Sequence, residues 1–94
     1  MTREDIVAFI EQEAPDDINE ILLADGFEDA FLGIAEMTWH GPLVAVYSRE
    51  RAIDILASQF DGDYDEAVEY LDFNVTGAYV GERTPVFALM FSKS

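Results

Sequence analysis

The sequence contains no cysteine and only one histidine, His40. The lack of cysteine excludes a disulfide framework and thiolate chemistry. One histidine without cysteine does not build an ordinary structural zinc site within one chain. No apolar run is long enough to span a membrane, and the N-terminus is too acidic for a signal peptide. We therefore expect a soluble cytoplasmic protein that has no metal and no cofactor.

Positive charge is also scarce. Twenty acidic residues face five basic ones, which gives a net charge of -15 at pH 7, whereas solubility of a small domain needs only about 2–8 charges. The acids are concentrated in two regions: residues 1–29 hold ten of them against Arg3 alone, and residues 61–72 hold six and no base. This charge argues against direct binding to nucleic acid or to an anionic membrane. It favours a partner that has a basic surface.

Apolar residues are plentiful enough for one folded domain over residues 1–94. Half of the residues are apolar and twelve are aromatic, so disorder is not expected. Their spacing predicts the order α-α-β-β-α-α-β, an α+β domain with four short helices and a three-stranded sheet. We expect the sheet to be antiparallel.

The first two predicted helices lie in the acidic N-terminal region. Residues 2–5 resemble a capped helix start, and Pro15 ends that helix. Asp17 with Glu20 forms a second capping-box pattern, which predicts a short helix that ends at the sequence Asp25-Gly26.

The predicted strands cover residues 31–39, 43–47 and 86–91. The first two are joined by a turn at residues 40–42 and read as a hairpin. The first and third strands are apolar on both faces, whereas a sheet with one wet face alternates apolar and polar residues. Two explanations stay open: helices cover both faces, or one face meets a second copy in a homodimer.

Ser48 caps the third predicted helix, and the fourth begins after a capping box formed by Asp63 and Glu66. Residues 61–72 also partly match the pattern of a calcium-binding loop that starts at Asp61. The match fails because position six is Glu66 where glycine is needed, and position twelve is Asp72 where a bidentate glutamate is needed. We therefore expect an acidic helix and no metal site.

No catalytic signature is present. The chain lacks a Ser-His-Asp order, a P-loop and a G-x-G-x-x-G motif, and His40 reads as an exposed turn residue. With twenty acids, carboxylate pairs arise by chance and indicate no glycosidase chemistry. These features predict that the protein is not an enzyme.

Two further stretches are secondary candidates for a binding site. Trp39, at the end of the first strand, is expected to cover the core, and its alternative role is that of a partner anchor. The stretch 77–85 reads as a compact turn whose Arg83 pairs with an acid. Its alternative role is a small-ligand or partner site formed by Tyr79, Glu82 and Arg83.

Three blocks of the chain carry a resemblance: L-x-A-D-G-F-E-D-A at residues 22–30, V-Y-x-x-E-x-x-I-x-I-L at 46–56, and E-A-V-E-Y-L-D-F-N-V-T-G-A-Y-V-G-E-R-T-P-V-F at 66–87. They resemble a set of small acidic proteins encoded by tailed bacteriophages and by some bacteria. The F-N-V-x-G-A-Y-V-G-E-x-T-P part is the most specific. The resemblance implies an origin, and with it the bacterial host cytoplasm, and it implies no mechanism.

Charge and resemblance together favour a non-enzymatic phage protein that binds the basic surface of a host protein. In its sharpest form this hypothesis makes the protein an acidic DNA mimic, used in counter-defence or host takeover, that occupies a nucleic-acid-binding protein. The predicted contact residues are Asp61, Asp63, Asp65, Glu66, Glu69 and Asp72. The alternative is a small-ligand or nucleotide-metabolite binding module near the turn at residues 77–85, and a solvated acidic surface without a partner also fits.

Overall fold

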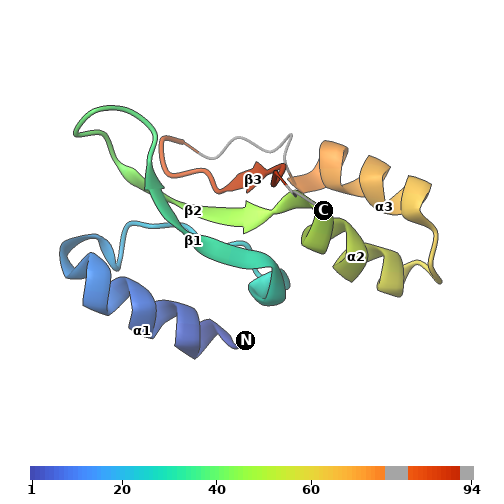
Figure 1. The fold of residues 1–94 in the computed structure, drawn as a ribbon, viewed down its shortest axis with the longest axis horizontal. Coiled ribbons are helices and arrows are strands. Elements are labelled where there is room, and N and C mark those ends of the chain that lie inside the picture. The colour runs from blue at the N-terminus through green and yellow to red at the C-terminus, as the bar shows by residue number, and fades with distance from the viewer. Residues whose placement is uncertain (76–80, 92–94) are drawn as a thin grey trace.

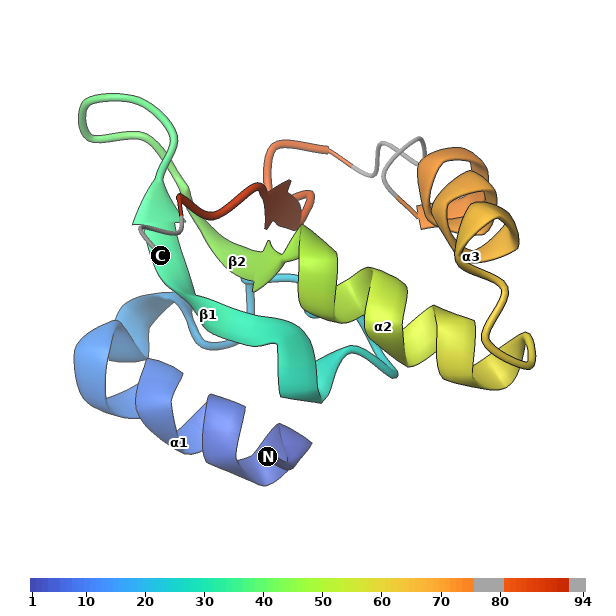
Figure 2. The ribbon, with the colours of Figure 1, turned by 45° about the vertical axis from the view of Figure 1, so that its right-hand side comes forward.

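The computed structural model describes residues 1–75 and 81–91 and shows a small α+β domain (Figure 1). Its helices are α1 (Arg3–Glu13), α2 (Arg49–Gln59) and α3 (Tyr64–Tyr70), and its strands are β1 (Phe31–Glu36), β2 (Leu43–Ser48) and β3 (Val86–Ala88). Short 3-10 turns lie at Pro15–Asp17 and Glu28–Ala30, and a π-helical turn at Leu71–Val75 follows α3. Figure 2 shows α1 along one side of the sheet and α2 continuing from the end of β2.

The helix starts agree with the sequence. Thr2 and Asp5 form a reciprocal capping box at α1: the Thr2 hydroxyl accepts from the Asp5 amide at 3.3 Å, and the Asp5 carboxylate accepts from the Thr2 amide at 3.0 Å. Both hydrogen bonds with Thr2 lower the pKa of Asp5 below its ordinary value, and the one from the Thr2 backbone amide has the larger effect. The Ser48 hydroxyl caps α2 by accepting from the Arg51 amide. The first, third and fourth predicted helices are confirmed as α1, α2 and α3.

The prediction of a second helix, beginning at Asp17, is wrong. Pro15–Asp17 forms a single 3-10 turn, and turns and irregular chain follow it up to Phe27. Asp17 and Glu20 form no capping box, because both carboxylates bind the Arg83 guanidinium. Gly26 does adopt a positive φ of 93°, as its predicted turn requires, but no helix precedes it.

The sheet order is β1-β2-β3. The predicted hairpin is confirmed: β1 and β2 are antiparallel, with Phe31 opposite Tyr47 and Glu36 opposite Leu43. The prediction of an antiparallel third strand is wrong, because β3 runs parallel to β2. The two helices between these strands form the crossover that a parallel pair needs, so the chain returns to the end at which β2 began. β3 also covers only three residues of the predicted range 86–91.

An aromatic row crosses the core face of all three strands. Phe31, Tyr47 and Phe87 come from β1, β2 and β3 in turn, with ring centroids 5.6 and 5.3 Å apart. Phe9 of α1 extends the row at one end and Phe27 at the other. The fully buried Tyr47 accepts a hydrogen bond from the Ala24 amide through its hydroxyl at 2.8 Å, so the ring also holds the irregular N-terminal chain.

None of the helices in the described residues has the length and the hydropathy required to cross a lipid bilayer.

Candidate partner-binding face

Helices α2 and α3 form a paired scaffold for the acidic residues. Leu56 and Ala57 of α2 share the buried core with Ala67 of α3 and with Leu71, which follows it. The Tyr64 hydroxyl in the first turn of α3 donates to the Asp54 carboxylate of α2 at 2.6 Å. This hydrogen bond raises the pKa of Tyr64 above its ordinary value. The two helices are therefore joined both by apolar packing and by a polar contact.

All six predicted contact residues lie on or beside α3 and are exposed. We call them the acidic face. Asp61 lies in the turn between α2 and α3, where it has a φ of 56°, and Asp63 is the N-cap. The others follow in helical order: Asp65, Glu66 and Glu69 in α3 and Asp72 in the π-helical turn. The six residues thus lie on α3 and on the turns at its two ends.

Two of these carboxylates already have structural roles. Asp63 accepts a hydrogen bond from the Glu66 amide at 3.0 Å, which confirms the predicted cap. Asp72 binds the Arg49 guanidinium at 2.7 Å and so ties the end of α3 to the start of α2. Neither group is as free to bind a partner as the sequence suggested.

The carboxylates of Asp65, Glu66 and Glu69 make no hydrogen bond or ion pair with any other described residue. A shallow hollow of about 310 Å³ lies beside two of them. It is lined by Glu66, Glu69, Tyr70, Phe73 and Asn74. The Tyr70 ring rests on Phe60 with centroids 5.5 Å apart, and the Phe73 side chain is 76% exposed.

This hollow combines two kinds of group that bind a cationic side chain. Carboxylates accept short hydrogen bonds from a guanidinium or an ammonium, and aromatic faces attract the same cations. Phe73 and Tyr70 were missed as binding residues in the sequence. Their spacing could have shown them, because Glu66, Glu69, Tyr70 and Phe73 occupy positions i, i+3, i+4 and i+7 of one helical stripe.

Arg83 is a structural residue in this fold. Its guanidinium binds Glu20 at 2.9 Å and Asp17 at 3.3 Å, and it donates to the Leu43 carbonyl at 3.1 Å. Its side chain is only 21% exposed. The predicted pairing with a nearby acid is confirmed, and it leaves little of this charge to attract an anionic ligand.

The prediction that Trp39 covers the core is wrong. Its side chain is 88% exposed at the tip of the β1–β2 hairpin. The His40 ring packs edge-on against it, with the two ring centroids 4.7 Å apart. Trp39 and His40 lie in the hairpin turn, beyond the end of the paired strands, because pairing stops at Glu36 and Leu43. His40 is an exposed turn residue with a φ of 54°, as predicted.

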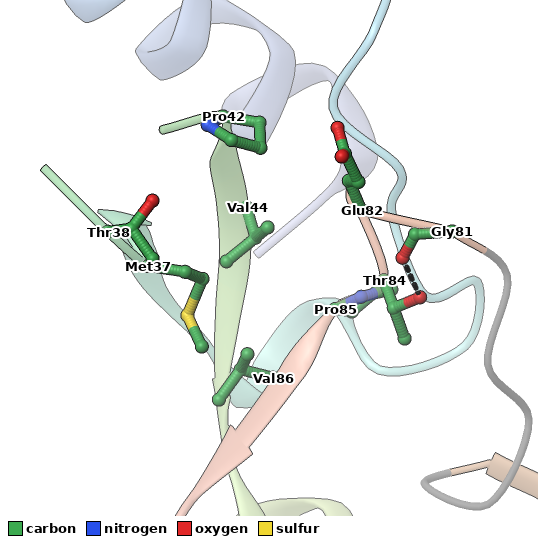
Figure 3. A pocket seen from close by; sticks show the side chains of 9 residues that line it. All are labelled: Met37, Thr38, Pro42, Val44, Gly81, Glu82, Thr84, Pro85 and Val86. Atoms are coloured by element: carbon green, nitrogen blue, oxygen red, sulfur yellow. Dashed lines mark hydrogen bonds between the residues drawn. The ribbon is translucent and has the colours of Figure 1, made fainter. Parts of the chain in front are cut away.

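A second hollow of about 410 Å³ lies between this hairpin and the segment that leads into β3. In Figure 3, Met37 and Thr38 lie on one side of it, Glu82 and Thr84 on the other, and Val44 between them. Glu82 is exposed, whereas Tyr79, the remaining candidate, lies outside the described residues. Among the described residues, no group of three acidic or histidine side chains could hold a metal ion.

No protein-family model, curated protein or solved structure matches this chain. The resemblance to small acidic phage proteins therefore stays a prediction that rests on the three sequence blocks.

Proposed function

We propose that this protein is a non-enzymatic binding module that docks its acidic face on the basic surface of a partner protein. The observation that carries the proposal is the set of carboxylates on α3 that have no partner among the described residues, beside two partly exposed rings. No described residue donates a hydrogen bond to the carboxylates of Asp65, Glu66 and Glu69. An arginine or lysine of the partner fits the hollow, with its charge on Glu66 and Glu69 and its stem on Tyr70 and Phe73.

The surplus of negative charge supports a nucleic-acid-binding partner. Proteins of that class present basic clefts that bind phosphates, and carboxylates on a helix can occupy such a cleft instead. Complementary charge speeds the encounter and disfavours wrong partners. With the phage resemblance, this gives a DNA mimic that acts on a protein of the bacterial host.

The proposal is tested by affinity capture of the tagged protein from bacterial lysate, with mass spectrometry of what is bound. We expect one enriched nucleic-acid-binding protein that is lost steeply as salt rises, because screening weakens contacts between exposed charges. Added DNA should displace it. An indiscriminate capture, or one insensitive to both salt and DNA, would contradict the mimic.

A charge-matched pair of variants then locates the binding surface. The triple variant Asp65→Lys, Glu66→Lys and Glu69→Lys should abolish capture of that partner, while circular dichroism shows a folded domain. The control reverses three acids of α1 whose carboxylates make no hydrogen bond or ion pair with another described residue: Glu4→Lys, Glu11→Lys and Glu13→Lys. Both variants change the net charge by +6, so capture should survive the control. If both variants lose the partner, net charge matters and the acidic face has no special role. If both keep it, the acidic face is not the surface that binds.

A small-ligand module is the second candidate, and the hollow in Figure 3 favours it. Gly81 and Pro85, which line this hollow, belong to the predicted turn at residues 77–85. Its lining is largely apolar, and Arg83 is already paired with Asp17 and Glu20, so an uncharged ligand suits it better than a phosphate. A thermal-shift screen with nucleotides, uncharged metabolites and divalent ions tests this, since a ligand of the native state raises Tm. An unchanged Tm with all compounds counts against it.

A further inference from the structure

Strand β3 is an edge strand that stops before its sequence pattern does. It lies at the end of the sheet order, so among the described residues no strand pairs with its outer edge. Pairing with β2 covers Val86–Ala88, but the apolar run continues through Leu89, Met90 and Phe91. These three side chains are 75, 50 and 90% exposed. Half of a six-residue strand pattern therefore pairs with no strand among the described residues.

The edge also lacks the usual protection against pairing. Exposed edge strands are generally blunted by charged side chains, prolines or bulges. Residues 84–91 contain no ionisable side chain, although the chain as a whole has twenty acids and five bases. Pro85 precedes the strand, so each of residues 86–91 has a backbone amide, and the amides not used by the ladder with β2 can donate to a new neighbour. An uncharged apolar edge in so acidic a protein indicates a surface that is covered.

We propose that β3 and the following residues 89–91 pair with the same segment of a second copy, antiparallel across a two-fold axis. The two sheets would then join into one six-stranded sheet in the order β1-β2-β3-β3-β2-β1. Such an interface is self-complementary, since each residue meets its own counterpart or a symmetric one. The free amide and carbonyl groups of the two edges form the new ladder.

The charge distribution favours a second copy as the occupant. Two chains with a net charge of -15 each repel one another wherever their acidic helices approach. Residues 84–91 bring no carboxylate to the contact, so copies can meet there at the lowest electrostatic cost. A basic partner, in contrast, is drawn to the acidic face and gains nothing from this edge.

Side-chain alternation adds an apolar contact to the ladder. Successive side chains of a strand point to opposite faces, so pairing that continues the strand through residue 91 would place Leu89 and Phe91 on the face of Phe87, which is the core face of the sheet. Pairing would therefore extend the row formed by Phe31, Tyr47 and Phe87 into the second copy.

The first test is sedimentation equilibrium over a range of protein concentrations. One chain has a mass of 10.5 kDa, so the dimer has 2 × 10.5 = 21.0 kDa. We expect the double variant Leu89→Lys, Phe91→Lys to be monomeric at concentrations where the unaltered protein is dimeric. The control Leu32→Lys, Trp39→Lys places the same charges at two exposed apolar residues elsewhere and should leave the dimer intact. A monomeric unaltered protein at about 1 mM, where about 4 kcal/mol of association would be visible, overturns the proposal.

Ionic strength separates this contact from partner binding. Added salt should strengthen the dimer, because screening reduces the repulsion between two acidic chains. The same salt should weaken capture by the acidic face. A dimer that dissociates as salt rises would be held by charges, and so would contradict pairing through an uncharged edge.

Cysteine cross-linking locates the contact, since the chain has no cysteine of its own. Single variants Ala88→Cys, Leu89→Cys, Met90→Cys and Phe91→Cys are oxidised and run on a non-reducing gel. A disulfide needs Cα atoms about 4.4–6.8 Å apart, so the yield should peak near the position on the two-fold axis and fall on either side. Met37→Cys, at the hollow on the sheet face, is the control. A yield that is flat across the four sites, or highest at the control, overturns the edge contact.

Discussion

The N-terminal region and the α3 region are both densely acidic, and the fold uses their acids in opposite ways. Side chains of six of the ten N-terminal acids hold another part of the chain. They are Asp5, Asp17, Glu20, Asp25, Glu28 and Asp29. On the acidic face, Asp63 and Asp72 alone do so among the contacts of the described residues. Acid density in a sequence therefore does not show which carboxylates remain available for a partner.

The difference follows from local structure. Residues 18–27 form no helix, so their backbone groups and turns depend on side chains for support. Arg3 binds Asp25 there at 2.7 Å, and the Glu28 carboxylate accepts from the Gly26 amide at 2.8 Å. Helix α3 satisfies its own backbone groups beyond the cap, and its outward side chains are left without a structural task.

The largest expected effect comes from removing the cation that holds the N-terminal acids. Arg83→Met should lower the free energy of unfolding by about 2–3 kcal/mol, because it leaves the partly buried Asp17 carboxylate, the exposed Glu20 carboxylate and the Leu43 carbonyl without their donor. Arg49→Met is the matched control. It should lower that free energy by about 0.5–1 kcal/mol, because its partner Asp72 is more exposed. Urea unfolding measures both, and equal losses would contradict a special role for Arg83.

A smaller effect should come from the α3 cap. Asp63→Ala should lower the free energy of unfolding by about 1 kcal/mol, since the Glu66 amide loses its acceptor. Asp65→Ala, two residues later in the same helix, should change that free energy by less than about 0.5 kcal/mol, since its carboxylate has no partner among the described residues. Thermal unfolding of the two variants provides the comparison. A larger loss for Asp65→Ala would show that the face is not free.

The smallest effect should come from neutralising the free acids. The triple variant Asp65→Asn, Glu66→Gln and Glu69→Gln should leave stability unchanged or raise it by up to about 0.5 kcal/mol, because repulsion falls and no contact is lost. Any gain should vanish at high salt. The isosteric triple Asp17→Asn, Glu20→Gln and Asp25→Asn changes the net charge equally, yet it should destabilise the protein through its lost ion pairs. Urea unfolding at low and high salt measures both. Equal results for the two triples would remove the distinction between the regions.

Local signals predicted the elements that local interactions determine. Capping residues such as Thr2, Ser48 and Asp63 marked three helix starts correctly, because each cap bonds within the next three residues. The hairpin was likewise visible in its alternating residues and its turn.

The errors concern interactions between distant residues. Asp17 and Glu20 looked like a helix start, but their partner Arg83 lies more than sixty positions away in the sequence. The direction of β3 depends on where the two intervening helices return the chain, and no letter within β3 specifies it. The six residues of the acidic face lie close together in the sequence, and the structure places them on or beside α3. Which of them are free depended on Arg49, which belongs to another helix.

The parallel pairing of β2 and β3 also sets an order of assembly. The β1–β2 hairpin and α2 are adjacent in the sequence and can form from nearby contacts. β3 can reach β2 only after the crossover through α2 and α3 is in place, and long-range contacts of this kind form slowly. Arg83 comes just before β3, so its bonds to Asp17 and Glu20 close in the same late step. Strand β3 therefore completes the sheet, and Arg83 beside it ties Asp17 and Glu20 of the N-terminal region to the segment that leads into this strand.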